Sequence, residues 1–203
     1  VAIDGKQLRR SYDKYLGKQG IYMVSAWATA NHLVLGQVKV DEKSNEITAI
    51  PELLKVLELS GCIVTIDAIG CQKELARTIV EDNDADYALA LKQNQGGLYE
   101  DVQELFRYAE EKGFEDCDQH QTVEKGHGRI EIRQCWTLSA PEYLAYLRDG
   151  DKWAGLRSLV MVKRERRLQD RIEQEIKYYI SSLPGDAQQL LEVIRGHWGI
   201  ENQ

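Results

Sequence analysis

The hydrophobic pattern of this chain changes its period part-way along, and that change limits the folds open to it. Residues 1–3, 21–29 and 33–40 are β-rich runs, and the short segment between the last two is typical of a hairpin. From residue 48 onward, helical and strand periods alternate. Helices are predicted at 48–59, 71–82 and 97–111, and strands at 62–66 and 86–91. A plain doubly wound sheet would alternate from its first strand, so the order favours a ribonuclease-H-like α/β layout.

The second half of the chain follows a different pattern. Strand-like runs at 129–138, 157–165 and 172–181 indicate a β-rich segment, and 184–201 returns to a helix with Asp186 at its start. We therefore expect an α/β fold, a ribonuclease-H-like mixed sheet flanked by helices, with a β-rich insertion before the last helix. The expected divisions are a first core part (1–112), the insertion (113–183) and the final core helix (184–203).

Composition places the chain among ordinary globular proteins. It has 203 residues, of which 43% are hydrophobic and 29% charged, and it contains no apolar run near the roughly 20 residues that span a bilayer. Its four cysteines lack zinc spacing, which favours free thiols in a reducing compartment. Without a signal peptide, a cytoplasmic, nucleoid-associated location is expected. Both ends fall inside patterned segments, so we expect a fragment of a longer chain, weak or inactive by itself.

The net charge of −7 argues against a nucleic-acid-binding surface spread over the whole molecule. Local basic clusters nevertheless remain, at residues 6–18 and 163–167. A run of charge is more often a solvated face than a binding site, and contacts made from 163–167 would reach phosphates without reading sequence.

Two aspartates each follow a predicted core strand. Asp4 comes directly after the first run, and Asp67 after residues 62–66. Ligands of α/β sheets bind beyond the carboxyl ends of the strands, so the two carboxylates converge if these strands are neighbours. Converging carboxylates repel each other, and a hard divalent cation removes that penalty. The alternatives stay open: Asp4 begins a turn dipeptide, and Asp67 caps the following helix.

Glu201 falls on the apolar stripe of the last predicted helix. At about 100° per residue, it shares one face with Leu190, Ile194 and Trp198. A carboxylate on a core-facing stripe is costly unless it has a partner, and a metal at the sheet edge would supply one. The alternative is that Gly196 and Gly199 break the helix before Glu201. Trp198 itself is interpreted as a core residue.

Polar residues in two further places are candidates for contact with DNA. Lys92 and Asn94 follow the strand at 86–91, and Lys125, His127 and Arg129 surround a two-glycine turn whose backbone could approach DNA closely. The plain interpretations are a polar strand-to-helix loop and a tight hairpin.

Six segments together resemble one family. They are V-A-I-D-G-K at 1–6, T-I-D-A-I-G-C-Q at 65–72, A-L-K-Q-N-Q at 90–95, E-K-G-H-G-R-I-E at 124–131, Y-Y-I-S-S-L at 178–183 and I-R-G-H-W-G-I-E-N at 194–202. In this order they are similar to the insertion-sequence transposases that include the H-repeat-associated proteins of enteric bacteria. The resemblance covers essentially the whole chain.

The resemblance implies a DDE triad that falls on Asp4, Asp67 and Glu201. It implies two Mg²⁺ ions, with Mn²⁺ as a substitute, and cleavage of transposon-end duplex DNA followed by strand transfer into target DNA. It also implies a homo-oligomer assembled on the DNA. Broader relatives carry the motif Y-x-x-R-x-x-x-E, which ends at the catalytic Glu. Here the Tyr place holds Ile194 and the Arg place holds His197, with Arg195 close by. Both His197 and Arg195 are candidates for DNA contact.

Two other functions fit the same residues. A nuclease would use the carboxylates without strand transfer, and pre-cleaved DNA ends would distinguish it. A decayed, non-catalytic remnant would bind DNA without needing the carboxylates or a metal.

Overall fold

The computed structural model describes residues 1–7, 11, 21–40, 46–126 and 128–201. Its main elements, in chain order, are β1 (Ala2–Gln7), β2 (Tyr22–Ala28), β3 (Leu33–Val40), α1 (Glu46–Lys55), β4 (Ile63–Ile66), α2 (Lys73–Arg77), β5 (Asp86–Leu91), α3 (Gly96–Glu111), β6 (Asp118–Gly126), β7 (Arg129–Leu138), α4 (Pro141–Tyr146), β8 (Ser158–Arg167), β9 (Ile172–Ser181) and α5 (Ala187–Glu201). Short helical turns lie at η1 (Ala68–Gly70), η2 (Thr78–Asp82), η3 (Gln93–Gln95) and η4 (Gly150–Lys152). No helix within these ranges is long and apolar enough to cross a membrane.

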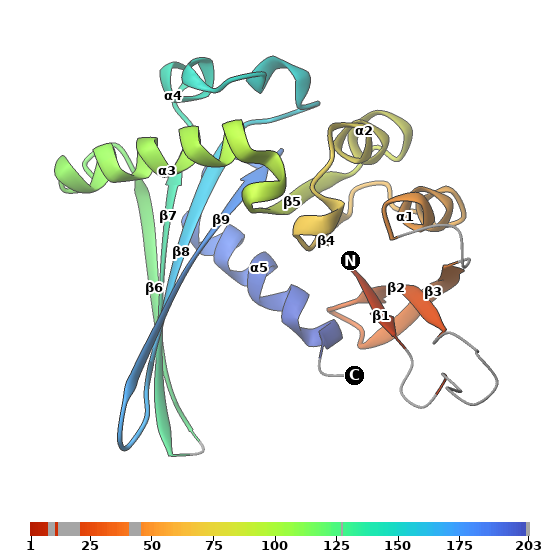
Figure 1. Cartoon of the computed structure of the whole chain (residues 1–203), viewed down its shortest axis with the longest axis horizontal. Coiled ribbons are helices and arrows are strands. Elements are labelled where there is room, and N and C mark those ends of the chain that lie inside the picture. Colours follow the sequence, from red (N-terminus) through yellow and green to blue (C-terminus); the bar gives the residue numbers. More distant parts are fainter. Residues whose placement is uncertain (8–10, 12–20, 41–45, 127, 202–203) are drawn as a thin grey trace.

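The strands of the described residues form a single mixed sheet (Figure 1). Its order is β3-β2-β1-β4-β5-β9-β8-β7-β6. β1, β2 and β3 form the predicted antiparallel meander, and β1, β4 and β5 run parallel to one another. The α/β fold with a mixed sheet flanked by helices is therefore confirmed.

The β-rich segment predicted at 113–183 continues this same sheet. β9 returns antiparallel beside β5, pairing Leu91 with Tyr178, and β8, β7 and β6 follow outward as successive antiparallel neighbours. These four long strands form a ribbon that extends well beyond the rest of the sheet (Figure 1). The sheet thus joins the first and second halves of the chain directly.

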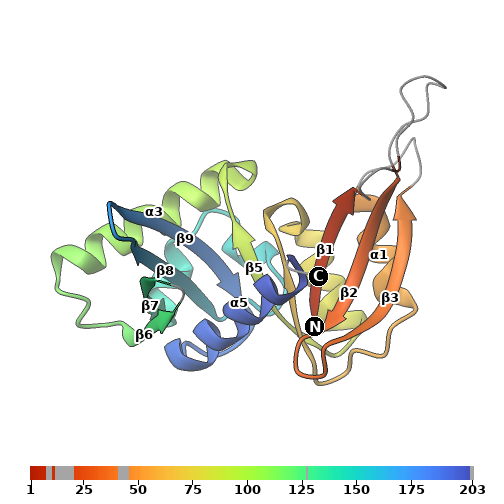
Figure 2. The same ribbon diagram turned by 90° about the horizontal axis from the view of Figure 1, so that it is seen from below.

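Alternating residues of the strands pack against different helices, because neighbouring side chains of a strand point to opposite faces. On β8, Leu159 and Met161 join the core beneath α1, α2 and α3, whereas Val160 and Val162 pack against α5. The α5 residues of the second core are Ala187, Leu190, Leu191 and Ile194, all at most 2% exposed. Among the described helices, α5 is the one that covers this face of the sheet, and it crosses the face toward β1 (Figure 2).

The element bounds differ from the sequence predictions in several places. The first strand was predicted to end at residue 3, but β1 continues to Gln7, and neither β6 nor α4 was predicted as a separate element. Two helices also differ. The helix predicted at 71–82 begins at Lys73 and changes to a π-helical turn at Thr78. The helix predicted at 48–59 ends at Lys55. At α5, the backbone N–H of Gln189 donates to Asp186 Oδ1 over 2.8 Å, so Asp186 caps the helix as expected.

Candidate active site

The register of β1 and β4 brings two aspartates to adjacent positions. Ala2 pairs with Thr65 and Ile3 with Ile66 in the parallel ladder, so the next residues along the two strands are Asp4 and Asp67. Ala2 packs against Ile200 of α5, and Asp4, two residues further, lies on the same face of the sheet. Thr65 also contacts α5, through a hydrogen bond with His197, and Asp67 follows Thr65 by two residues. Both carboxylates therefore belong to the α5 face. Asp67 follows the last residue of β4, whereas Asp4 lies within β1, just past the part of β1 that pairs with β4. β1 continues to Gln7, and Asp4 and Gly5 pair with Ser25 and Val24 of β2, so the expectation that the first strand ends at Asp4 and the alternative of a turn there are both wrong.

Asp67 also caps the turn that follows it, as the plainer interpretation held. Its Oδ1 accepts a hydrogen bond of 3.1 Å from the backbone N–H of Ile69 at the start of η1. This bond fixes the orientation of the side chain. The cap and a metal-binding role are compatible, because a carboxylate has two oxygens that accept several interactions.

α5 advances in the same direction as β1 and β4. Gly196 lies against Thr29 just after β2, His197 Nδ1 lies 2.9 Å from Thr65 Oγ1, and Ile200 packs against Ala2. The helix continues through both glycines to Glu201, so the alternative that they break it is wrong. Glu201 follows His197 by four residues, about one turn, and its backbone is therefore on the helix face directed at β4. The side chain of Glu201 lies outside the described part of the structure.

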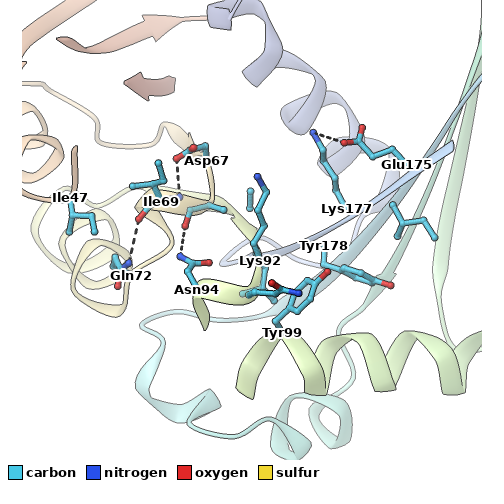
Figure 3. A pocket seen from close by; sticks show the side chains of 15 residues that line it. Ile47, Asp67, Ile69, Gln72, Lys92, Asn94, Tyr99, Glu175, Lys177 and Tyr178 are labelled. Atoms are coloured by element: carbon cyan, nitrogen blue, oxygen red, sulfur yellow. Dashed lines mark hydrogen bonds and ion pairs between the residues drawn. The ribbon is translucent and has the colours of Figure 1, made fainter. Parts of the chain in front are cut away.

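A groove of about 740 Å³ begins at Asp67 and runs between β5 and β9 (Figure 3). Lys92 and Asn94 both line it, as do Gln72 and Lys177. Asn94 Nδ2 donates to the carbonyl oxygen of Ala68 over 2.6 Å, which holds the loop after β5 against the turn after Asp67. The two predicted DNA contacts at this loop therefore lie beside Asp67.

The other predicted DNA contacts lie elsewhere. Lys125 and Arg129 are exposed at the distal end of the β6–β7 hairpin, and His127 lies outside the described residues. Arg195 of α5 forms an ion pair with Glu124 of β6, and His197 contacts Thr65 rather than the groove lining. The predicted set thus divides into a loop at the groove, a hairpin tip, and two α5 residues bound to the sheet.

Charged residues of the ribbon meet α5 at a place that sequence analysis missed. Arg133 and Glu131 form a 2.6 Å ion pair with both side chains under a tenth exposed. Trp198 is half-buried instead of a core residue, and three cations lie over its ring at 5.2–5.6 Å, namely Arg133, Arg164 and Lys177. The alternation in 129–138 correctly predicted which residues share a face of β7. It did not predict which face is covered: Glu131 and Arg133 are buried, whereas Ile132 on the apolar face is only half-buried.

The basic run 163–167 does lie at the end of a hairpin, as predicted. Several of its charges are paired with acidic neighbours: Arg164 with Glu175 at 2.6 Å, and Arg167 with Glu165 at 2.6 Å. This favours the interpretation of a largely compensated surface.

Asp4 and Asp67 are a donor set that fits a hard divalent cation. Mg²⁺ in phosphoryl-transfer sites commonly takes one or two carboxylates and completes its shell with water and substrate phosphates. Asp4 and Asp67 supply two such carboxylates side by side. Within the described residues no group of three or more His, Cys, Asp or Glu side chains is arranged around one point; the side chain of the third predicted ligand, Glu201, is not among them.

Comparison with known families decides the relationship. The family model described as "Transposase DDE domain" matches residues 1–203. The chain belongs to this family. Transposase DDE domain relatives include "Putative protein YbfL" and "H repeat-associated putative transposase YhhI" of Escherichia coli K12, each 42% identical over all of this chain and 54% of the relative. "Putative transposase YncI" of E. coli O157:H7 is 44% identical over all of this chain and 52% of its own length.

The chain therefore spans about half the length of these relatives. Among solved structures, the sugar N-methyltransferase KedS8 of a Streptoalloteichus species is 14% identical, with coverage of 69% of this chain and 50% of that one. Its TM-score of 0.26 is too low to support a shared fold. The resemblance to the H-repeat-associated transposases is confirmed by family and relatives alike.

Proposed function

We propose that this domain carries the catalytic carboxylates of a metal-dependent transposase, which cleaves transposon-end DNA and joins it to target DNA. The observation that carries the proposal is the register of β1 and β4, which places Asp4 of β1 next to Asp67, the residue after the end of β4. α5 runs toward the same edge and ends with Glu201. The order β3-β2-β1-β4-β5 supports a ribonuclease-H-like core, with 113–183 as an insertion and 184–203 as the final core helix.

Divalent cations, Mg²⁺ or Mn²⁺, would be held by Asp4, Asp67 and Glu201, and would polarise the scissile phosphate and the attacking oxygen. The protein contributes position. Asp67 is oriented by the N–H of Ile69, and α5 is bound to β4 through His197 and Thr65. Lys92 and Asn94 lie beside Asp67, where they can hold the DNA backbone near the site. Such catalysis depends on preorganised placement of charge.

The partner in this proposal is duplex DNA, both the transposon ends and the target. We also propose that the protein assembles as a homo-oligomer on paired transposon ends and acts at the bacterial nucleoid, in the cytoplasm. The transposase names of relatives such as YhhI support DNA as the substrate. Because the chain spans about half of such a relative, activity of the chain alone is expected to be weak.

The test is nicking of supercoiled plasmid DNA in Mn²⁺ by the chain and by its Asp4→Asn and Asp67→Asn variants. We expect slow nicking by the parent and none by either variant. Nicking that persists in Asp67→Asn would contradict the proposal. Pre-cleaved duplex ends then separate the candidate functions, because a transposase joins them to plasmid and a nuclease does not. DNA binding without any metal-dependent chemistry, equal in parent and variants, would favour the remnant.

A further inference from the structure

Two lysines face each other where β5 and β9 separate. The antiparallel ladder between these strands ends with Leu91 opposite Tyr178. The next residue on β5 is Lys92 and the preceding residue on β9 is Lys177. The backbone of Lys92 is still extended, with φ −138° and ψ −173°, so the two lysines occupy the next opposing positions of the ladder.

These lysines lie on the same face of the sheet as the aspartates. Residues opposite each other in an antiparallel ladder point to one side, and Lys177 shares its side of β9 with Tyr179, which packs against α5. On β5, Ala90 also packs against the α5 core and shares its side with Lys92. Figure 3 shows Lys92 between Asp67 and Lys177 in the groove.

Like charges at directly opposite positions of a sheet destabilise it. Lys92 makes no ion pair with any other residue in the described ranges. The acidic neighbour of Lys177 is Glu175, 3.4 Å away on the same strand and 40% exposed, which offsets its charge only in part. The ammonium of Lys177 also lies 5.3 Å from the centre of the Trp198 ring. This cation–π contact holds the Lys177 ammonium over the groove and leaves its positive charge in place.

An anion between the two ammonium groups would remove this repulsion. The groove reaches Asp67 on one side and Lys177 on the other, so an extended chain of phosphates can pass both. Charge-assisted hydrogen bonds from lysine to phosphate oxygens suit such a site. Arg164, from the neighbouring strand, lies 5.2 Å over the same indole and forms a 2.6 Å ion pair with Glu175, so that carboxylate is shared between Arg164 and Lys177.

We infer that Lys92 and Lys177 form a clamp for a backbone phosphate of the DNA strand that enters the metal site, and that Trp198 positions Lys177 for it. Lys177 is thereby a substrate-binding residue beyond the carboxylates and the loop after β5. The inference rests on the proposed function, because it takes the strand in the groove to be the one that is cleaved.

The experiment measures the affinity of the chain for a short linear DNA duplex by fluorescence anisotropy, with Ca²⁺ in place of Mg²⁺, at several salt concentrations. The variants are Lys92→Gln, Lys177→Gln, the double variant and Lys177→Arg. Lys112→Gln is the matched control, because Lys112 follows α3 and lies over Tyr108. Thermal unfolding verifies that each variant is folded.

Each single glutamine variant should bind the duplex about 3- to 10-fold more weakly than the parent. In the double variant, the slope of log affinity against log salt concentration should be smaller in magnitude by about 1, as expected for one lost phosphate contact. Lys177→Arg should retain most of the affinity, and Lys112→Gln should match the parent. Binding by Lys177→Gln equal to that of Lys112→Gln would overturn the inference.

Failure of the proposed function has a different signature. Cleavage that does not need Asp67, together with weakened binding by Lys177→Gln, leaves the clamp in place and removes the catalytic assignment. Cleavage that needs Asp67, together with normal binding by Lys177→Gln, removes only the clamp. A parent chain that binds no duplex overturns both.

Discussion

Thr65 Oγ1 and His197 Nδ1 lie 2.9 Å apart, across 132 residues of sequence, and this hydrogen bond joins the last helix to the strand that ends at Asp67. Thr65 is 6% exposed, so the bond is shielded from water on the strand side. The bond fixes the position of α5 relative to β4, and hence the position of Glu201 at the end of the helix.

Replacing Thr65 with valine removes this bond while it preserves the shape of the side chain. We expect a loss of about 1–3 kcal/mol in the free energy of unfolding, because a polar group of His197 loses its partner. Mn²⁺ affinity should fall as well. Thr137→Val is the matched control: its hydroxyl donates to the Gly185 carbonyl over 2.6 Å near the start of α5, remote from the aspartates. Equal Mn²⁺ affinity in both variants, measured by calorimetry, would argue against a positioning role for Thr65.

The buried pair of Glu131 and Arg133 should respond asymmetrically to substitution. Arg133→Met leaves Glu131 without its closest partner and should cost about 3–5 kcal/mol of unfolding free energy. Converting both residues, as Glu131→Leu with Arg133→Met, should recover most of that loss, because no charge is then left buried. Urea denaturation of the three proteins measures this, and a double variant as unstable as the single one would show that the charges themselves are required.

The contact between α5 and β6 should weaken in acid. Desolvation raises the pKa of Glu124, but hydrogen bonds and charges from Arg133 and Arg195 outweigh it, so the pKa lies below its ordinary value. A carboxyl whose pKa is lowered on folding contributes stability above its unfolded pKa of about 4.3, and that contribution is lost as the pH falls through the lowered value.

The corresponding variant is Glu124→Gln. It should be less stable than the parent at pH 7, and the difference should shrink progressively below about pH 4.3. Unfolding free energies of both proteins across this range provide the measurement. A difference that stays constant with pH would mean that the charge of Glu124 does not stabilise the contact.

A glycine close to Asp67 is held by packing. A Cβ at Gly70 would lie 2.2 Å from Ile66 Cγ2 and 3.3 Å from Ile50 Cδ1, so Gly70→Ala forces the turn after Asp67 to shift. We expect a loss of about 1–3 kcal/mol, as for overpacked cores. Gly96→Ala is the control, because nothing lies within 4 Å of a Cβ there. Denaturant unfolding should separate the two, and equal midpoints would show that the turn adjusts freely.

Local patterns predicted much of the fold. α3 follows from its helical period over 16 residues, and β2 and β3 follow from β-rich runs separated by a short turn. β4 has only four residues and was predicted from its continuous apolar run, which is typical of a buried strand. The pairing of β9 with β5 could not be predicted in this way. It joins residues about 90 positions apart, and nothing in either run specifies its partner.

The candidate site likewise contains some residues that the sequence predicts and others that only the strand pairing identifies. Asp4 and Asp67 could be proposed because each follows an apolar run, and the register of β1 and β4 makes them neighbours, although β1 continues past Asp4 to Gln7. Lys177 was missed because it lies within a strand whose neighbours alternate in an ordinary way. Its position opposite Lys92 exists only once β5 and β9 are paired. Trp198 was assigned to the core because its helical phase is apolar, whereas the strands beneath it present cations at that place.

The central claim is that Asp4 and Asp67 share a metal site, and calorimetric titration of Mn²⁺ tests it most directly. The parent chain, Asp4→Asn, Asp67→Asn and the exposed control Asp82→Asn would be compared, with thermal unfolding of each at saturating metal. We predict binding and thermal stabilisation in the parent and in Asp82→Asn, and loss of both in Asp4→Asn and in Asp67→Asn. Equal binding in all four proteins would contradict the account, because the metal would then be held by other groups.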